Sequence, residues 1–536
     1  MTAEQFDGEW DYLVVGGGSA GCVLANRLSE DGRNRVLLLE AGGSDRHPWL
    51  HIPAGFLKTF RDPRFNWCFE TEPGKGVDGR RIFFPRGKVL GGSSAINGHL
   101  WVRGQARDFD TWAQRGCQGW SYADVLPFFQ RIEDRSAGAD AWRGAGGPQH
   151  VSDIHARHPL CEAFLAGTAE LGLPRNPDYN GERQEGAFYY QRSIRRGRRM
   201  SASTAFLRPA LRRPNLRVET QAQVLRIELE GRHATAVVFR RAGRLLRVAP
   251  RREVVLAAGA IGSPHLLQVS GIGPAALLQA AGVPVLHDLP GVGEGLQDHY
   301  ALRVVRRVTG TATLNERARG LRLGFEAAAW LTARRGLLAF SPAHAGVFLR
   351  SQPHLEEPDL QFVFTPASYL EGGVTGGLER EPGMTLGVWQ LRPESRGHVR
   401  LRGPDPTEAP MIQPNYLAAP EDQRAAVAGL RWARRLLETR PLARFRGAET
   451  VPGARCEEEE ALLAHARARG STVYHATSTC RMGLDPQAVV APDLRVHGLA
   501  GLRVVDASVM PALVSANTNA ATMMIAEKAA SMIRTG

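Results

Sequence analysis

The sequence predicts an α/β fold, α+β overall, in which a Rossmann-like nucleotide-binding domain is interleaved with a second domain built on an antiparallel sheet with helices. Three observations predict it. A strand, a glycine-rich turn and a helix follow one another between residues 11 and 28. An apolar strand that ends in an acid, at 502–506, lies close to the C-terminus. Between them, 360–364 and 397–401 have the composition of strands in an antiparallel sheet.

The N-terminal unit has the pattern of a dinucleotide-binding site. Residues 11–15 are a short apolar strand, three glycines follow in the spacing GxGxxG, and 22–28 continue as a helix. Gly16 permits the tight turn, Gly18 lets the backbone approach a pyrophosphate, and Gly21 lets the helix pack close to the strand. The helix N-terminus offers free N–H groups and a positive dipole end to phosphates.

A second strand, 35–39, ends at Glu40, 19 residues after Gly21, where a carboxylate binds ribose hydroxyls. An acid there disfavours a 2′-phosphate, so FAD or NAD is favoured over NADP. The first unit alone does not separate FAD from NAD. Two later apolar strands, 254–260 and 502–507, return the chain to the same sheet. That arrangement resembles FAD-binding oxidoreductases, in which the terminal acid lies near the ribityl chain.

Composition excludes several classes of protein. The chain has 536 residues and a net charge of +13, but only four of its 67 basic residues are lysine and the arginines are scattered. We therefore expect no nucleic-acid partner, and the densest basic run, 195–199, is expected to be a solvated turn. No apolar run is long enough to span a membrane. The N-terminus lacks a signal peptide and the six cysteines form no CxxC pair, which favours free thiols, no metal site and a cytoplasmic location.

Several ordered motifs resemble one family. Residues 85–98 (PRGKVLGGSSAING) resemble the first signature of the glucose–methanol–choline (GMC) oxidoreductases, and 259–273 (GAIGSPHLLQVSGIG) resemble the second. Further matches are 66–67, 289–299, 392–397 and 504–511, so the resemblance covers nearly the whole chain. It is strongest with the bacterial FAD-dependent alcohol and choline dehydrogenase-like branch.

The resemblance implies a set of FAD contacts. Val224 would contact the adenine through its backbone, Trp67 would lie near the flavin, and the amides of the small residues 91–94 would stabilise charge on the reduced ring. Some members link the flavin through a histidine at the position of Ile96, so non-covalent FAD is expected. The predicted cofactor residues are Gly16, Gly18, Ser19, Ala20, Gly21, Glu40, Ala41, Trp67, Arg86, Gly91, Gly92, Ser93, Asn97, Gly98, Val224, Ala258, Gly259, Asp506, Ala507, Thr518 and Asn519.

Alcohol oxidation needs a base for the hydroxyl proton, and the resemblance assigns this role to His475 in the segment YHATSTCRMG. Asn517 holds the second catalytic position; its amide can donate to the alcohol oxygen but does not titrate. The helix expected at 520–529 would direct its positive end toward the reduced flavin. His99 is expected to be structural, with a substrate-side role as the alternative, and His344 is a candidate for the lining of the substrate pocket. Ser263 is expected to cap a helix that begins at Pro264.

The chain is expected to divide into FAD-binding segments at 1–155, 205–300 and 470–536, with substrate-domain segments at 156–204 and 301–469. The predicted activity is FAD-dependent oxidation of a primary alcohol to the aldehyde. Four alternatives stay open: a non-redox lyase of the same fold, a flavin-binding protein without turnover, an NAD-dependent dehydrogenase, and a choline-type dehydrogenase, whose cationic substrate needs an anionic or aromatic cage. The acceptor is oxygen or a quinone or other carrier. Peripheral membrane association is compatible with the sequence, and the oligomeric state is not indicated.

Overall fold

The computed structural model describes residues 3–370 and 376–535, and its central element is a five-stranded parallel sheet. The strand order is β11-β3-β2-β15-β27, and the strands come from three distant parts of the chain. Their bounds are β2 (Trp10–Val15), β3 (Val36–Leu39), β11 (Leu216–Glu219), β15 (Pro250–Leu256) and β27 (Leu502–Val504). The apolar residues of β2 and β3 and the last three residues of β15 are buried, in agreement with their apolar sequences.

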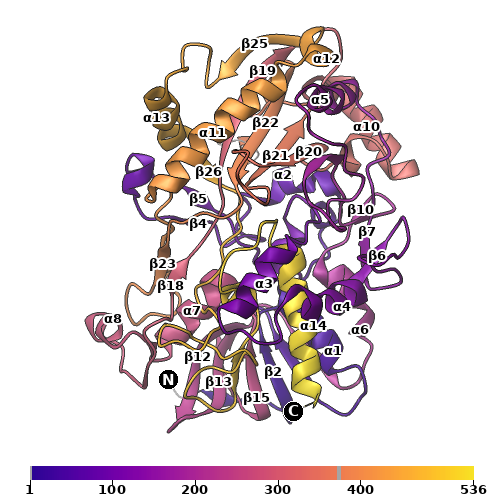
Figure 1. Cartoon of the computed structure of the whole chain (residues 1–536). Coiled ribbons are helices and arrows are strands. Elements are labelled where there is room, and N and C mark those ends of the chain that lie inside the picture. Colours follow the sequence, from indigo (N-terminus) through magenta and orange to yellow (C-terminus); the bar gives the residue numbers. More distant parts are fainter. Residues whose placement is uncertain (1–2, 371–375, 536) are drawn as a thin grey trace.

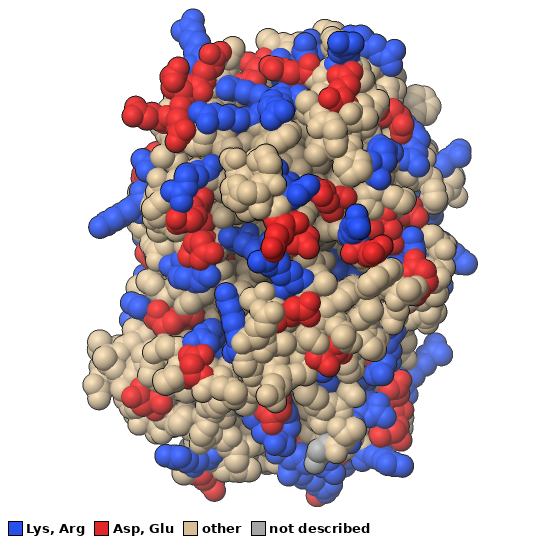
Figure 2. All heavy atoms as spheres, viewed as in Figure 1, with Lys and Arg blue, Asp and Glu red and all other residues tan. Residues whose placement is uncertain are grey.

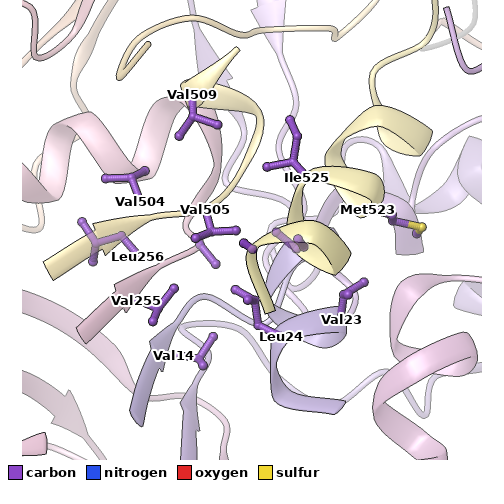
Figure 3. Packing of buried hydrophobic residues seen from close by; sticks show 14 of the residues in the cluster. Val14, Val23, Leu24, Val255, Leu256, Val504, Val505, Val509, Met523 and Ile525 are labelled. Carbon is purple, nitrogen blue, oxygen red and sulfur yellow. The ribbon is translucent and has the colours of Figure 1, made fainter. Parts of the chain in front are cut away.

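Two helices from opposite ends of the chain pack on this sheet (Figure 1). They are α1 (Ser19–Leu28) and α14 (Asn519–Thr535), which lie against each other. Figure 3 shows Leu24 of α1 and Ile525 of α14 packed near Val14 and Val255 of the strands. Since α14 is the last element of the chain, this core is complete only when the whole chain has folded.

A second sheet, β1-β14-β13-β12, packs beside the parallel one through β13 and β15. Its strands are β1 (Glu4–Gln5), β12 (Gln223–Glu230), β13 (His233–Arg241) and β14 (Arg244–Val248). The strand expected around Val224 is therefore present and longer than predicted.

The antiparallel sheet has seven strands in the order β25-β19-β22-β21-β20-β8, with β26 also paired to β19. The bounds are β8 (Gly186–Tyr189), β19 (Tyr300–Val308), β20 (Ala345–Leu349), β21 (Leu360–Thr365), β22 (Gly383–Gln390), β25 (Arg446–Val451) and β26 (Ser471–Thr472). Alternate residues of β19, β21 and β22 enter a core shared with α5 (Pro159–Glu170) and α11 (Pro420–Leu437). In Figure 1, α11 lies across these strands. The residues between them face the other way, toward the parallel sheet.

Two expectations about elements are corrected. The segment at 397–401 forms β23 (Gly397–Arg400), which pairs with β18 (Glu294–Leu296) and β24 (Met411–Gln413) and does not join the seven-stranded sheet. Pro393 lies between β22 and β23 and has no N–H with which to continue the ladder. The sequence of 424–439 also predicts an amphipathic helix. The helix observed there, α11, begins earlier than this prediction, because Pro420 occupies its first turn.

The domain boundaries stay predictions, and 371–375 of the expected substrate domain, like the first two residues of the N-terminal segment, lie outside the described residues. The other helices are α2 (Phe56–Thr59), α3 (Ala106–Gln114), α4 (Tyr122–Ile132), α6 (Arg208–Ala210), α7 (Gly259–Val269), α8 (Ala275–Ala280), α9 (Leu314–Arg317), α10 (Gly320–Ala333), α12 (Arg440–Ala443) and α13 (Glu459–Arg469). The other strands are β4 (Phe69–Glu70), β5 (Phe83–Phe84), β6 (Glu133–Arg135), β7 (Gln149–Val151), β9 (Ile194–Arg195), β10 (Arg198–Arg199), β16 (Ile272–Gly273) and β17 (His287–Asp288).

Charges on the surface are mixed. On the face shown in Figure 2, Lys and Arg side chains are interspersed with Asp and Glu. All six cysteines are free. Within the described ranges, no helix is long and apolar enough to cross a membrane, and no group of three or more His, Cys, Asp or Glu side chains is placed to hold a metal ion.

Candidate active site

A cavity of about 630 Å³ lies between the parallel sheet and the seven-stranded sheet, and it brings together most of the predicted site residues. The predicted residues that line it are Gly16, Gly18, Ser19, Ala20, Glu40, Ala41, Trp67, Arg86, Gly92, Ser93, Asn97, Gly98, Val224, Ala258, Gly259, His475, Asp506, Ala507, Asn517, Thr518 and Asn519. Gly21 and Gly91 do not line it.

These two glycines support the packing of the segments that surround the cavity. A Cβ on Gly21 would lie 1.8 Å from the Gly16 carbonyl oxygen, so the glycine allows α1 to pack against the turn. The Gly91 N–H donates to the Gly17 carbonyl at 2.7 Å and is therefore not free for a ligand. Neither glycine lines the cavity, and the FAD contact expected for each stays a prediction.

Glycine also sets the width of the nucleotide half of the cavity. Gly16 has a φ of +104°, and a Cβ there would lie 2.5 Å from the Ala257 carbonyl oxygen. Gly92 also has a positive φ, and its Cβ would lie 2.7 Å from the Cα of Gly18. Two loops from different motifs therefore meet backbone to backbone, which leaves space for a flat or extended ligand.

Glu40, the acid that directly follows β3, lines the nucleotide half of the cavity. The Glu40 carboxylate accepts hydrogen bonds from the backbone N–H groups of Gly17 and Gly42, both at 2.7 Å. Burial raises the pKa of Glu40 to about 7, although these two N–H groups and Lys88 act in the opposite direction. The carboxylate lines the cavity at the distance in sequence expected for a ribose ligand, and that role stays a prediction.

Two helix N-termini converge on the cavity. Helix α1 begins at Ser19 and α14 begins at Asn519, and the Ser19 hydroxyl donates to the Asn519 side-chain oxygen at 2.7 Å. Both helices are at least ten residues long, so both present a positive dipole end and unpaired N–H groups. A pyrophosphate and a reduced, anionic ring would both be stabilised in such a place.

Asp506 joins the second signature to the C-terminal strand. Its carboxylate accepts from Gly259 N–H at 2.8 Å and from the Ser263 hydroxyl at 2.6 Å. Helix α7 begins at Gly259, so Ser263 lies inside the helix and the expected cap before Pro264 is wrong. The Ser263 oxygen instead accepts from Ala258 N–H at 3.1 Å, which satisfies an amide just before the first turn.

Two further side chains, from Trp67 and Arg199, contact residues of the first signature at 85–98. Trp67 stacks on Phe69 with centroids 5.8 Å apart, and the Lys88 ammonium lies 4.4 Å from the Trp67 ring. Arg199, from the basic run at 195–199, is buried and donates to the Asn97 carbonyl and side-chain oxygens at 2.7 and 2.8 Å. The expectation of a fully solvated turn is therefore wrong for Arg199, whose desolvation lowers its pKa to about 9.

At the other end of the cavity, a chain of side-chain contacts holds His475. Its Nε2 atom lies 3.0 Å from the Asn517 Nδ2 atom, and its Nδ1 atom lies 2.8 Å from Nδ1 of His299. The Nε2 atom of His299 lies 2.9 Å from the Leu391 carbonyl oxygen. The Asn517 Oδ1 atom accepts from Gln361 Nε2 at 3.2 Å. The two residues assigned to catalysis, 42 positions apart in sequence, are thus brought into contact.

These contacts determine the positions of the protons. A carbonyl oxygen can only accept, so His299 must carry a proton on Nε2. Burial lowers the pKa of His299 to about 4, so the ring is neutral and its Nδ1 accepts. His475 must then donate from Nδ1, which leaves the lone pair of its Nε2 directed at Asn517. The reversed arrangement would require a charged His299 in a desolvated place, which is costly.

The backbone of His475 is also held by a hydrogen bond. The buried Asp298 carboxylate accepts from His475 N–H at 2.6 Å, from the Thr472 hydroxyl at 2.5 Å and from the Tyr416 hydroxyl. Tyr474, the residue before His475, has a φ of +70°. Since this conformation is costly for a residue with a side chain, the surrounding hydrogen bonds hold it in place.

Electrostatics keep His475 neutral. Burial lowers its pKa well below the ordinary value, and the neighbouring His299 and Arg86 lower it further. A neutral imidazole with an exposed Nε2 lone pair can accept a proton. Arg86 itself has unpaired Nε and Nη2 donors among the described residues and lines the cavity.

The substrate half is walled by the seven-stranded sheet. Cavity-lining residues alternate along its strands: Ala301 and Arg303 of β19, Val363 and Thr365 of β21, and Thr385, Gly387 and Trp389 of β22. His99 also lines the cavity, and neither of its ring nitrogens has a hydrogen-bond partner within the described part of the chain. Its ring packs edge-on against Phe56, and its role stays a prediction. His344 is partly buried, packs edge-on against Phe340 and does not line the cavity.

The glycine cradle, the paired helix N-termini and the buried unpaired donors fit a dinucleotide. With a neutral imidazole at the far end of the same cavity, this arrangement fits an enzyme that uses such a cofactor. The family model for GMC oxidoreductase matches residues 10–301 and 393–526. The chain therefore belongs to the GMC oxidoreductase family.

Individual relatives agree. The chain is 43% identical over 538 residues to mitochondrial choline dehydrogenase of Homo sapiens, with 98% of this chain and 90% of the relative covered. It is 38% identical over 530 residues to the alcohol dehydrogenase (acceptor) of Pseudomonas putida, with 98% and 95% covered. Among solved structures, pyridoxine 4-oxidase from Mesorbium loti superposes with a TM-score of 0.89 at 32% identity, with 98% and 100% covered.

The protein is an FAD-dependent oxidoreductase that acts on CH–OH donors, as the family resemblance predicted. Ile96 lines the cavity and offers no nucleophile for a covalent link to the cofactor, in agreement with non-covalent binding. Sequence reasoning missed His299, Gln361 and Arg303. His299 lies within a recognised motif, which was a usable signal, whereas nothing in the sequence distinguishes Arg303 from the many other arginines.

Proposed function

We propose that the protein oxidises a primary alcohol to the aldehyde by hydride transfer to the flavin N5, with His475 as the base. The observation that carries the proposal is the fixed tautomer of His475. Its Nε2 lone pair meets the amide of Asn517 at the wall of the cavity that also contains the nucleotide cradle. FAD, when bound there, supplies the hydride acceptor.

The chain's own groups then have distinct tasks. An alcohol oxygen that replaces the direct hydrogen bond between Asn517 Nδ2 and His475 Nε2 donates its proton to Nε2 and accepts a hydrogen bond from Nδ2 of the amide. Gln361 holds the Asn517 oxygen, so the amide presents its N–H₂ side to the alcohol. As His475 takes the proton, its Nδ1–H stays bonded to His299, which limits reorientation of the ring.

The first experiment is an anaerobic absorbance titration of the FAD-loaded protein with primary alcohols, followed by admission of air. Bleaching by an alcohol is expected, and it separates oxidation from the lyase alternative. Rapid return of colour in air indicates oxygen as acceptor, and slow return indicates a quinone or another carrier. Absence of bleaching by all alcohols tested would contradict the proposal.

His475→Ala tests the base. We expect FAD to be retained and the rate of alcohol oxidation to fall by about 10²–10⁴-fold, the usual contribution of a positioned base. Chemical reduction of the flavin by dithionite checks that the variant's cofactor is intact. Added imidazole should restore part of the activity, and unchanged turnover without it would refute the assignment.

A choline-type dehydrogenase is the second candidate, because curated relatives carry that name and aromatic side chains line the substrate half. Phe60, Tyr369, Trp389 and Tyr474 are these aromatic residues. Choline is therefore included among the alcohols tested. The cellular compartment stays a prediction.

A further inference from the structure

Among the residues that the structure describes, the substrate half of the cavity contains a positive charge without a paired carboxylate. Arg303 lies on β19 and lines the cavity. Two arginines further along the strand are ion-paired: Arg306 with Glu438 and Glu449, and Arg307 with Glu379 and Glu381. Across residues 3–370 and 376–535, no carboxylate forms an ion pair or hydrogen bond with Arg303.

The acidic groups that line the same cavity lie elsewhere. Glu40 is bonded to the N–H groups of Gly17 and Gly42, and Asp506 is bonded at the start of α7. Glu408 is exposed. The titratable groups that act on Arg303 are the hydroxyls of Tyr369 and Tyr474, which are neutral at physiological pH. The guanidinium therefore enters the cavity as an uncompensated cation.

A desolvated guanidinium is costly unless an anion or several acceptors satisfy it, and arginine does not escape the cost by losing its proton. The cavity wall offers little to satisfy it. Arg303 is paired across the sheet with Gly387, which also lines the cavity and has no side chain that could contact the guanidinium.

We propose that the substrate is a primary alcohol that carries a carboxylate, and that Arg303 binds this carboxylate. This inference rests on the proposed function. Ala301 pairs with Trp389, whose ring lies 6.2 Å from the His475 ring. Arg303 is two residues further along β19, about 7 Å away along the strand. The carboxylate therefore lies several bonds from the carbon that bears the hydroxyl.

The same charge acts against a cationic alcohol. A quaternary ammonium beside Arg303 would meet like charge in a place of low dielectric, where repulsion is strong. The proposal therefore separates this chain from the choline dehydrogenases that it resembles, although the aromatic side chains nearby would suit either substrate.

The test compares matched alcohols on the FAD-loaded enzyme. The probes are 4-(hydroxymethyl)benzoate against 4-methylbenzyl alcohol, 6-hydroxyhexanoate against 1-hexanol, and choline. In the wild type, kcat/KM is expected to be at least about tenfold higher for each carboxylate than for its neutral partner, since a charged hydrogen bond is involved. A preference for the neutral alcohols or for choline would overturn the proposal.

Substitutions on β19 test whether Arg303 causes the preference for carboxylates. Arg303→Met should lower the ratio of kcat/KM between carboxylate and neutral alcohol by about 10- to 100-fold, mainly through KM, and Arg303→Lys should keep part of it. Arg306→Met, on the same strand but outside the cavity, is the control and should keep the wild-type ratio. An unchanged ratio in Arg303→Met would refute the assignment.

A binding measurement keeps this test separate from that of the proposed function. The unreactive 4-methylbenzoate should perturb the flavin absorbance of the wild type and bind at least about tenfold more weakly to Arg303→Met. If no alcohol bleaches the flavin but this difference is seen, the proposed oxidation fails and the anion site stands. If alcohols bleach the flavin but 4-methylbenzoate binds equally to both proteins, the anion site fails.

Discussion

The orientation of one imidazole ring depends on a residue that touches neither the cavity nor the substrate. His299 connects the Leu391 carbonyl oxygen to Nδ1 of His475. Because burial keeps His299 neutral, the carbonyl fixes its tautomer and thereby that of His475. His299 is therefore a positioning residue, and its contribution depends on an acceptor atom at the position of its Nδ1.

Two substitutions of His299 separate this role from simple packing. His299→Leu removes the acceptor, and we expect kcat to fall by about 10- to 100-fold, as when outer hydrogen-bond partners of a site are removed. His299→Asn places a side-chain oxygen near the former Nδ1 and should retain most of the activity. The measurement is the rate of flavin bleaching in single turnover, with equal FAD content as the control. Equal losses in the two variants would indicate packing alone.

The roles of residues could be predicted where a local sequence motif indicated them. The glycines at 16–21 and the segment around His475 stand in contexts specific enough to name a function, and the structure places His475 against Asn517. The roles of His299 and Arg303 depend on partners that are distant in sequence, or on the absence of a partner. Leu391, which orients His299, is 92 residues away, and no spacing rule connects them.

At the scale of elements, two loops meet where side chains would not fit. Gly18 directly precedes α1. Gly92 lies in the first signature and has a φ of +51°. A methyl group on Gly92 would lie 2.7 Å from backbone, which cannot rotate away. The loops form opposite walls of the nucleotide half, so their separation sets the space available to FAD.

Gly92→Ala is expected to weaken FAD binding by at least about tenfold, through displacement of the loop and the cost of a positive φ. Gly43→Ala is the matched control, because a Cβ there meets nothing within 4 Å. The measurement is the dissociation constant of FAD for the deflavinated proteins by fluorescence. Equal FAD affinity in the two variants would contradict the close approach as a determinant of the site.

Element types were easier to predict than partners. The strand at 397–401 exists nearly as expected, but it joins β18 and β24 because the chain leaves the larger sheet at Pro393. A Cβ on Gly397 would lie 1.9 Å from the Gln413 carbonyl oxygen, so this glycine permits the pairing with β24. Alternation of side chains identifies a strand, whereas the sheet that it joins depends on turns and close approaches elsewhere.

At the scale of the whole molecule, the cavity requires both sheets and both ends of the chain. The nucleotide half is built from residues near the N-terminus and closed by α14, while the substrate half is a face of the seven-stranded sheet. This interleaving buries polar groups at the junction, including histidines that the sequence presents as ordinary. Their burial couples the stability of the fold to pH.

Acid is expected to destabilise the protein through these histidines. Desolvation lowers the pKa of His265 and His299 to about 4 and that of His344 to about 3. Between about pH 6.5 and pH 4 the unfolded chain therefore binds protons that the folded chain does not, so the free energy of unfolding falls as pH falls. The raised pKa of Glu40, about 7, and the raised pKa values of the buried Asp298 and Asp506 act in the opposite direction, but the histidines with a lowered pKa outnumber these carboxyl groups.

The expected result is an apparent unfolding temperature, measured at saturating FAD, that falls steadily from pH 7 to pH 5, with a loss of free energy on the order of a few kcal/mol. His344→Phe removes one partly buried histidine that lies outside the cavity and packs against Phe340, so it should flatten this dependence. His354→Gln, at an exposed position, is the matched control and should follow the wild type. If His344→Phe has the wild-type pH dependence, protonation of that ring does not contribute to acid unfolding, and the loss arises from other groups, such as His265 and His299.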